Sequence, residues 1–351
     1  MRPLGFLFLD MKKYFILIIV SIFLFACLDI PALQGITPPA PETPTLGLPP
    51  TQPATLTPPP TVTASPTSTP PTFAIRRVLI ISIDGLRPDV INLAPMPYLL
   101  SLLLKSAYSL SAQTVQPSST LPAHTSMLSG LCVLKHNVRW NEYIPQNGYA
   151  IGTDLFDLAH AAGYKTVMYV GKEKLRQITE PQSTDIFQFV DRPGSILIDD
   201  ILMTQLLTNF PQDFGLMFVH LRDVDIAGHD TRWLSRKQLD TAYIADQEIN
   251  RLLNALDKYN LRNETLVIIT ADHGGNGENH VENIPENATI PWIVFGPGVQ
   301  PKKLTTRIHI TDTAATAAYA LGLKIPKEWD GIPVYEAFGL PVQPHAEPVC
   351  P

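Results

Sequence analysis

The fold is decided by the stretch Thr265-Leu266-Val267-Ile268-Ile269-Thr270-Ala271-Asp272-His273-Gly274-Gly275. It opens as an unbroken β-branched and apolar run, which is typical of a strand buried on both faces of a parallel sheet. It closes on Asp272 and His273, so a carboxylate and an imidazole stand at the carboxyl end of that strand, where open α/β sheets bind their ligands. An isolated Asp-His-Gly is most often a polar turn. Other predicted strands of the chain end on similar groups, which favours a site.

Further strands and helices are predicted on both sides of this run. Buried strands are expected over 78–83, 165–170, 216–221 and 291–295, and helices over 96–104, 155–162, 236–259 and 314–321. In the helix over 236–259, apolar side chains recur at helical spacing along one face. Strands that alternate with helices predict a mainly parallel sheet covered on both sides.

The composition is that of a globular domain joined to a low-complexity segment. The chain has 351 residues, of which 45% are hydrophobic and 17% charged, with a formal net charge of −6. This mildly acidic balance argues against a surface that coats nucleic acid, which needs a basic excess. The 34 prolines crowd towards the N-terminus, so the globular part is expected over residues 74–340, followed by a Pro-rich tail over 341–351.

Residues 1–27 are predicted to be an export signal. Lys12 and Lys13 precede an apolar run over 14–26 that is short for a transmembrane helix and has positive charge on one flank only. The run ends in Leu24-Phe25-Ala26-Cys27, which resembles the bacterial lipobox whose cysteine becomes lipid-modified. Phe25 is unusual there, so ordinary signal cleavage or no cleavage stays open. The prediction is an exported lipoprotein, extracellular or periplasmic and anchored to a membrane.

Residues 28–73 are predicted to be a disordered tether. From Pro31 onward the segment is almost only Pro, Thr, Ala and Ser, which cannot bury a core and favours extended polyproline conformations. A glycosylated stalk is the alternative, with the same spacing role. Beyond the signal only Cys132 and Cys350 remain. An exported domain could pair them, but sequence does not show that they are close, and a structural or free thiol is expected.

Four places in the predicted sheet carry acidic or imidazole groups at or just after a strand end. They are Asp84, the pair Asp225 and His229, the pair Asp272 and His273, and the following His280. Asp225 and His229 lie four positions apart, so one helical turn or a tight loop aims both at one point. Carboxylates mixed with imidazoles, without thiolates, suit zinc or manganese in a hydrolytic site.

Thr120 is the nucleophile candidate. It precedes a predicted helix with Pro122 in its first turn, a favoured position for proline. A hydroxyl there would sit at the positive end of the helix, which stabilises an alkoxide and a bound phosphate. Threonine is also an ordinary N-cap, and a nearby metal ion would favour the nucleophile by lowering the pKa of the hydroxyl.

These residues stand in motifs that resemble the alkaline phosphatase superfamily, specifically its type I phosphodiesterase/nucleotide pyrophosphatase branch. The motifs are Ile83-Asp84-Gly85, Thr120-Leu121-Pro122-Ala123-His124, Asp225-Ile226-Ala227-Gly228-His229 and Ala271-Asp272-His273-Gly274. They follow the order of the family from about Arg76 to Glu336. The resemblance implies an alkaline-phosphatase-like three-layer α/β/α sandwich around a mainly parallel sheet.

The resemblance also implies two divalent metal ions. Zinc is the preferred ion, and manganese is the alternative. Asp84, Thr120, Asp272 and His273 would hold one ion, and Asp225, His229 and a third histidine the other. Thr120 would attack the phosphoryl group and form a phosphothreonine, with Asn141 and the Leu121 N–H steadying the developing charge. The implied substrates are small phosphodiesters or nucleotide pyrophosphates.

The third histidine is a choice between His280 and His309. In the animal phosphodiesterases of this branch the last ligand follows a long insertion, which this chain lacks. His280 lies in a Gly/Asn-rich loop just after His273 and is preferred. His309 alternates with Ile308 and Ile310, which predicts an exposed strand residue. His220 is expected to be structural, and His124 is expected to support a ligand.

Other functions compete with this hypothesis. A phosphonate hydrolase or a phosphomonoesterase of the same superfamily stays open, although no arginine lies beside Thr120 as in many monoesterases. The Cys-x-Pro-x-Arg motif of sulfatases is absent from the Thr120 segment. A surface protein that has lost activity is disfavoured, because every expected ligand type is present. Lys172 and Lys174 are expected to be a solvated surface pair outside the site.

Overall fold

The computed structural model describes residues 75–190, 198–345 and 349–350. The expected signal, Cys27 and the tether lie outside the described residues, as do 346–348 and 351 of the expected tail. Within the described ranges, no helix is long and apolar enough to span a bilayer.

An 8-stranded sheet runs through the centre of the fold in the order β4-β3-β5-β1-β6-β7-β2-β8. Strands β4, β3, β5, β1 and β6 pair in parallel, and β7 runs antiparallel to both β6 and β2. The strands are Arg77–Ile83 (β1), Ala107–Gln113 (β2), Lys165–Val170 (β3), Ile186–Phe189 (β4), Phe214–Leu221 (β5), Thr265–Thr270 (β6), Thr289–Phe295 (β7) and Lys302–Lys303 (β8).

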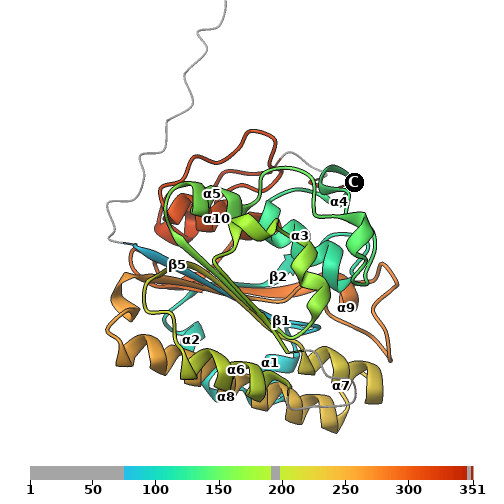
Figure 1. Cartoon of the computed structure of the whole chain (residues 1–351). Helices are drawn as coiled ribbons and strands as arrows, with labels where there is room; N and C mark the ends of the chain where they lie inside the picture. Colours follow the sequence, from blue (N-terminus) through green and yellow to red (C-terminus); the bar gives the residue numbers. More distant parts are fainter. Residues whose placement is uncertain (1–74, 191–197, 346–348, 351) are drawn as a thin grey trace, which may run out of the picture. The chain divides into compact units, whose positions relative to one another are not determined.

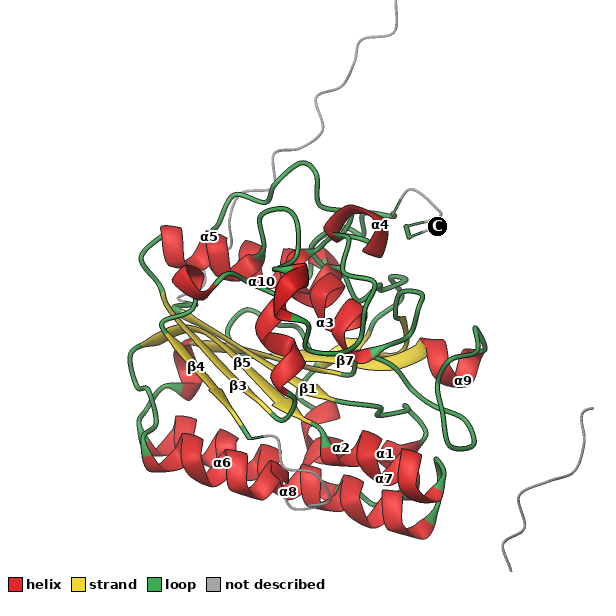
Figure 2. Ribbon diagram, turned by 45° about the vertical axis from the view of Figure 1, so that its right-hand side comes forward, coloured by secondary structure: helices red, strands yellow, loops and turns green. Residues whose placement is uncertain are grey.

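Helices cover both faces of the sheet, which makes three layers (Figure 1). In both views, α1, α2, α6, α7 and α8 lie on one face and α3, α5 and α10 on the other (Figure 2). The helices are Val90–Leu93 (α1), Pro97–Leu103 (α2), Thr120–Ser129 (α3), Val133–His136 (α4), Leu155–Ala161 (α5), Ile198–Thr208 (α6), Asp223–Thr231 (α7), Arg236–Lys258 (α8), Pro285–Ala288 (α9) and Asp312–Ala320 (α10). Short 3₁₀ helices lie at Pro145–Asn147 (η1), Glu173–Gln177 (η2), Pro181–Ser183 (η3), Arg262–Glu264 (η4) and Tyr335–Phe338 (η5).

The hydrophobic pattern explains the layers. All residues of β5 and β6 are buried, as expected for central parallel strands with helices on both faces. Helix α8 buries the apolar stripe that its sequence predicted, including Ala242, Ile249 and Leu252. The predicted mainly parallel sheet is therefore confirmed, as are the predicted strands and helices to within a few residues at their ends.

Three strands and several helices were not anticipated from the sequence. Strand β2 is a mixed polar segment whose buried and partly exposed positions alternate irregularly, and β4 has only 4 residues. Both lie away from the centre of the sheet, where one-sided burial leaves a weaker apolar signal. Helix α6 follows residues 191–197, which are outside the described part of the chain.

The register of the central strands sets the position of the site. Ser82 of β1 pairs with His220 of β5 and with Thr270 of β6, and Val170 of β3 pairs with His220. Two residues beyond these aligned positions come Asp84, Asp272 and Lys172. Three strands thus deliver a charged side chain at the same level of the same sheet edge.

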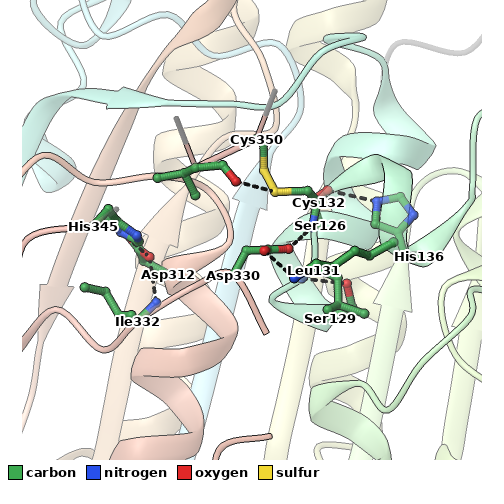
Figure 3. Close-up of a disulfide and its surroundings, with 12 residues drawn as sticks. Ser126, Ser129, Leu131, Cys132, His136, Asp312, Asp330, Ile332, His345 and Cys350 are labelled. Atoms are coloured by element: carbon green, nitrogen blue, oxygen red, sulfur yellow. Dashed lines mark hydrogen bonds and ion pairs between the residues drawn. A yellow bond between two sulfur atoms is a disulfide. The ribbon is translucent and has the colours of Figure 1, made fainter. Parts of the chain in front are cut away.

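Cys132 and Cys350 form a disulfide, with their Cα atoms 5.4 Å apart (Figure 3). The expectation of a structural or free thiol is therefore wrong. The sequence separation of 218 residues hid the contact, which the fold creates by bringing the C-terminal segment beside the start of α4. Asp330 strengthens this junction by accepting a hydrogen bond from the Cys132 N–H at 2.8 Å.

Candidate active site

The structure gathers the predicted metal-binding side chains at the carboxyl edge of β1, β5 and β6. Asp84 directly follows β1, Asp225 and His229 lie in α7 just beyond β5, and Asp272 and His273 follow β6. His280 comes from the following loop. Two sets of ligand atoms lie within 4.8 Å of one another: those of Asp84, Asp272 and His273, and those of Asp225, His273 and His280.

The first donor group consists of Asp84, Asp272 and His273, all fully buried. His273 Nε2 lies 3.4 Å from Asp84 Oδ1 and 3.3 Å from Asp272 Oδ2. None of these three atoms has a hydrogen-bond partner among the described residues. Three buried ligand atoms therefore converge with their lone pairs uncommitted.

The second donor group consists of Asp225, His229 and His280. Asp225 Oδ1 lies 3.4 Å from His229 Nε2 and 3.9 Å from His280 Nε2. It is buried and has no hydrogen-bond partner in the part of the chain that the structure describes. Helix α7 presents Asp225 and His229 on one face, as their spacing predicted.

Each acid holds one oxygen atom on the protein and turns the other towards its donor group. Asp84 Oδ2 accepts from His220 Nε2 at 2.9 Å, and Asp272 Oδ1 accepts from the Gly85 N–H at 3.2 Å. Asp225 Oδ2 accepts from Lys172 Nζ at 2.6 Å. The carboxylates are thereby fixed in orientation while the second oxygen of each stays available.

The three histidines are oriented in a common way. His229 Nδ1 lies 2.8 Å from the Glu278 carbonyl, His273 Nδ1 lies 2.8 Å from the Gly274 carbonyl, and His280 Nδ1 lies 2.5 Å from the Ser118 carbonyl. A ring nitrogen beside a carbonyl oxygen carries the proton and donates. Nε2 of each ring is then the basic nitrogen that metal-binding histidines present.

Both donor groups fit a divalent metal ion. Two ligands about 2.1 Å from a tetrahedral zinc ion lie about 3.4 Å apart, close to most of the separations in each group. Carboxylate and imidazole donors without thiolates suit zinc or manganese. The uncommitted, buried oxygen and nitrogen atoms are otherwise costly, and a metal ion would satisfy them.

The electrostatics differ among the acids. Burial alone would raise the pKa of Asp84, but the Lys172 ammonium and the His220 hydrogen bond outweigh burial and hold it well below its usual value. Burial, reinforced by the Asp84 charge, raises the pKa of Asp272 well above its usual value. Burial and His273 lower the pKa of His280 to about 3, which keeps its imidazole neutral and able to act as a ligand.

Thr120 is the first residue of α3 and is buried. The N-cap is Ser119, so the alternative role of Thr120 as the N-cap does not apply. Its hydroxyl is therefore not needed to cap α3. Thr120 Oγ1 accepts a hydrogen bond from Lys172 Nζ at 3.2 Å. His280 is tied to the same loop, because Ser118 Oγ donates to the His280 carbonyl at 2.6 Å.

Lys172 and Lys174 belong to this site, and their expected place as a solvated surface pair is wrong. Lys172 is 8% exposed, and its Nζ lies 2.7 Å from Asp84 Oδ2 and 2.6 Å from Asp225 Oδ2. Lys174 Nζ donates to the carbonyl and to Oδ1 of Asn141, at 2.9 and 3.1 Å. The signal was present in the sequence, because Gly171-Lys172 follows β3 as Asp84 follows β1.

Asn141 lies outside α3 but contacts the first turn of that helix, next to Thr120. Its Oδ1 accepts from the Leu121 N–H at 2.9 Å. The Leu121 N–H is therefore engaged within the protein, in contrast to the expected role of a donor to substrate. The same bond directs the Asn141 amide towards the helix start.

The histidines outside the donor groups take separate places. His220 bonds Asp84, and His124 Nδ1 lies 2.8 Å from the Thr120 carbonyl and 3.3 Å from Asp272 Oδ2. His309 is buried, and its backbone forms an isolated parallel β-bridge with Gln113. The expectation of an exposed strand residue is therefore wrong. Its ring packs 5.0 Å from that of His345, and neither donor group contains it.

Trp233 is a site residue that sequence reasoning missed. Its Nε1 donates to the Gly85 carbonyl at 2.9 Å, and its ring packs beside His229 and His280. A Cβ atom at Gly275 would lie 2.0 Å from Trp233 Cε2. The glycine is therefore required where the loop after β6 passes over the indole, and Trp233 holds that loop beside α7.

Comparison with curated proteins finds relatives that are named as phosphate transferases. The chain is 25% identical over 257 residues to GPI ethanolamine phosphate transferase 1 of Saccharomyces cerevisiae, covering 65% of this chain and 28% of the relative. It is 25% identical over 266 residues to the protein of that name from Candida glabrata, covering 66% and 28%. The chain thus spans less than a third of the length of these relatives.

Comparison with solved structures shows the fold. A phosphonate monoester hydrolase from Silicibacter pomeroyi superposes with a TM-score of 0.61 at 17% identity, covering 75% of this chain and 77% of that chain. Murine ectonucleotide pyrophosphatase/phosphodiesterase 5 superposes with a TM-score of 0.57 at 14% sequence identity, and the match covers 71% of this chain and 96% of that chain. A 2-O GAG sulfatase superposes with a TM-score of 0.64 at 16% sequence identity, and the match covers 77% of this chain and 76% of that chain. The expected alkaline-phosphatase-like sandwich is confirmed.

The family itself is shown by the sequence match. Residues 78–318 match the family described as type I phosphodiesterase/nucleotide pyrophosphatase. The matched region contains Asp84, Thr120, Asp225, Asp272 and His280, and runs from β1 into α10. The chain therefore belongs to the type I phosphodiesterase/nucleotide pyrophosphatase family.

Proposed function

We propose that this protein is a metal-dependent hydrolase of phosphodiester or nucleotide pyrophosphate bonds that forms a covalent phosphothreonine at Thr120. The observation that carries the proposal is the buried Thr120 hydroxyl, which shares Lys172 Nζ with Asp84 and Asp225. Asp84, Asp225, Asp272 and His273 each turn a buried, uncommitted oxygen or nitrogen atom into the same cluster of ligands. Membership of the family supports the reaction class.

One divalent ion would be held by Asp84, Thr120, Asp272 and His273. The other would be held by Asp225, His229 and His280. Zinc is the preferred ion for both sites, and manganese is the alternative. When bound, such a pair of ions offsets phosphoryl charge and lowers the pKa of a neighbouring hydroxyl. The rest of the chemistry falls to the chain. Thr120 would lose its hydroxyl proton and form a new P–O bond as the bond from phosphorus to the leaving group breaks. The leaving group is the alcohol or alkoxide of a diester, or the phosphate of a pyrophosphate. Water then cleaves the phosphothreonine and regenerates the Thr120 hydroxyl.

Asn141 and helix α3 orient the phosphoryl group. Asn141 Oδ1 is occupied by Leu121 and Lys174, which leaves the amide NH₂ group to donate to a phosphoryl oxygen. The N-terminal end of α3 (Thr120–Ser129) adds the positive end of the helix dipole at the same point. Both features stabilise charge that grows on the phosphoryl oxygens during transfer.

A second candidate function is hydrolysis of phosphomonoesters or phosphonates, and Lys172 and Lys174 favour it. A cavity of about 250 Å³ adjoins the site and is lined by Glu142, Tyr143, Lys172, Glu173, Lys174, Arg222 and Ile226. Cations beside the nucleophile stabilise a dianionic phosphoryl group more than the monoanion of a diester. The named activity of the curated relatives adds a phosphoethanolamine ester as a further substrate to test.

A substrate panel separates these candidates. Zinc-loaded protein would be assayed with bis-nitrophenyl phosphate, nitrophenyl thymidylate, nitrophenyl phosphate, phosphonoacetate, a phosphoethanolamine diester and nitrophenyl sulfate. The proposal expects the highest kcat/KM with one of the diesters. A clear preference for nitrophenyl phosphate or phosphonoacetate would select the second candidate. Binding of substrates without turnover of any would indicate an inactive surface protein.

The choice of His280 as the last ligand makes a testable prediction. His280→Ala is expected to lower bound zinc by about one ion per chain and to remove most activity, because it deletes a ligand of the second donor group. His309→Gln, the control, keeps a polar side chain at the rival position and should retain both ions. Zinc content by mass spectrometry and turnover check this, and the reverse pattern would show that His309 is the ligand.

The localisation proposal rests on the N-terminal sequence. If Cys27 carries the lipid, residues 28–73 tether the domain to a membrane, and Cys27→Ser should move the protein from the membrane to the soluble fraction. The assay is fractionation after expression in a bacterial host that processes lipoproteins. Unchanged membrane retention would show that the apolar run over 14–26 is itself the anchor.

A further inference from the structure

Lys172 lies where the two donor groups meet, outside every motif that carries the family resemblance. Its Nζ contacts Asp84 Oδ2 at 2.7 Å and Asp225 Oδ2 at 2.6 Å. These carboxylates belong to different donor groups. We infer that Lys172 is a positioning residue that joins the two groups, so that both need it to bind their metal ions at full affinity. The inference rests on the proposed metal dependence of the enzyme.

The choice of oxygen atoms carries the inference. Lys172 bonds the Oδ2 atom of each aspartate, whereas the Oδ1 atoms face the histidines and have no hydrogen-bond partner among the described residues. An ammonium on one oxygen of a carboxylate stops the group from rotating about its χ2 bond. The other oxygen then stays aimed at the histidines. Lys172 and a metal ion therefore use different atoms of the same carboxylates and need not exclude one another.

The fold holds Lys172 in this place. Strand β3 ends beside β5, and the Gly171 N–H donates to the His220 carbonyl at 3.2 Å. A Cβ atom at Gly171 would lie 2.9 Å from Arg222 Cγ and 3.0 Å from Arg222 Cβ, so only glycine allows this close approach. The lysine stem then spans β5 to reach Asp84, which explains why a side chain from β3 contacts one that follows β1.

The third contact brings the nucleophile into the same unit. Lys172 Nζ also lies 3.2 Å from Thr120 Oγ1. One ammonium therefore touches Asp84 from the first group, Asp225 from the second and the Thr120 hydroxyl. A donor with three tetrahedral N–H bonds can serve all three oxygens at once. Charge alone would not need this arrangement.

Positioning and charge predict opposite effects on metal affinity. If Lys172 were only a nearby positive charge, its removal would relieve repulsion and tighten zinc binding. If it orients the carboxylates, its removal should weaken binding by about 10- to 100-fold, the usual effect of losing a partner that orients a metal ligand. The sign of the change therefore decides between the two roles.

The test is a zinc titration of the metal-stripped protein against a chromophoric competing chelator. Lys172→Met is expected to weaken binding of both ions by about 10- to 100-fold, while Lys172→Arg, which keeps a charged donor, recovers part of the loss. Lys174→Met is the matched control, because Lys174 is in the same loop but contacts Asn141 and neither aspartate. Because Lys174→Met removes a nearby positive charge and no contact to the aspartates, its zinc affinity should not fall below that of the wild type.

Each other outcome overturns a defined claim. Wild-type affinity or tighter binding in Lys172→Met would overturn the positioning role and leave the proposed function standing. A wild-type protein that binds no zinc or manganese would overturn the proposed function and this inference with it. Circular dichroism establishes that each variant is folded. Should Lys172→Met not fold, Lys172→Ala also removes the donor, and unchanged zinc affinity there would equally overturn the inference.

Discussion

Thr120→Val is expected to reduce turnover by roughly 10³-fold or more, because it removes the only group proposed to form the covalent bond with phosphorus. Valine matches the shape of threonine and keeps the β-branch. Ser119, and not Thr120, is the N-cap of α3, so the helix should still form. Asp84, Asp272 and His273 remain, so most bound metal should also remain.

Thr120→Ser is the matched control for this result. Serine keeps a hydroxyl at the same backbone position and should retain measurable turnover. Steady-state kinetics on the best substrate of the panel, with zinc content measured on the same samples, separates loss of the nucleophile from loss of metal. Near-wild-type turnover by the valine variant would mean that water attacks phosphorus directly and that Thr120 has a structural role.

Removal of the metal ions is expected to abolish activity and to destabilise the fold. Asp84, Asp225, Asp272 and His273 are buried together, and each of them has a side-chain ligand atom without a hydrogen-bond partner among the described residues. Without the ions these buried polar atoms stay unsatisfied, which costs stability. One ion present at about 1,000 times its Kd contributes about 4 kcal/mol. For a domain of this size that corresponds to a Tm change of roughly 10 °C.

The measurement is a thermal melt and an activity assay before and after treatment with a chelator, followed by return of zinc or manganese. Restored Tm and turnover would identify the metal that serves the site. His280→Ala gives an intermediate case, since it deletes a ligand of one donor group only. Equal Tm and equal turnover in treated and untreated protein would contradict metal dependence.

The sequence was sufficient to predict the mainly parallel sheet and the sheet edge at which the candidate metal ligands gather. A continuous apolar run predicts a buried strand, and Asp84 and Asp272 each come shortly after such a run. Because β1 and β6 pair in register, equal distance from the strand end means proximity in space. His280 could be preferred over His309 for its short distance from His273 in the chain, and the structure places it 3.9 Å from Asp225 Oδ1.

What the sequence did not reveal depends on contacts between distant segments. Lys172 follows β3 just as Asp84 follows β1, but a lysine in a polar loop is usually solvated, and only the register shows that this one is buried. The Leu121 N–H is occupied because Asn141 folds back onto α3. Cys132 and Cys350 meet through the path of the C-terminal segment, and Trp233 fits under Gly275 through the packing of two loops.

The stereochemistry of the reaction tests the central claim most directly. The substrate would be a chiral phosphorothioate analogue of the best ester found in the panel, hydrolysed in oxygen-18 water. Attack by Thr120 followed by attack of water inverts phosphorus twice, so the covalent mechanism predicts retention of configuration, whether or not the phosphothreonine accumulates. Inversion of configuration would mean a single displacement by water and would contradict the proposed mechanism.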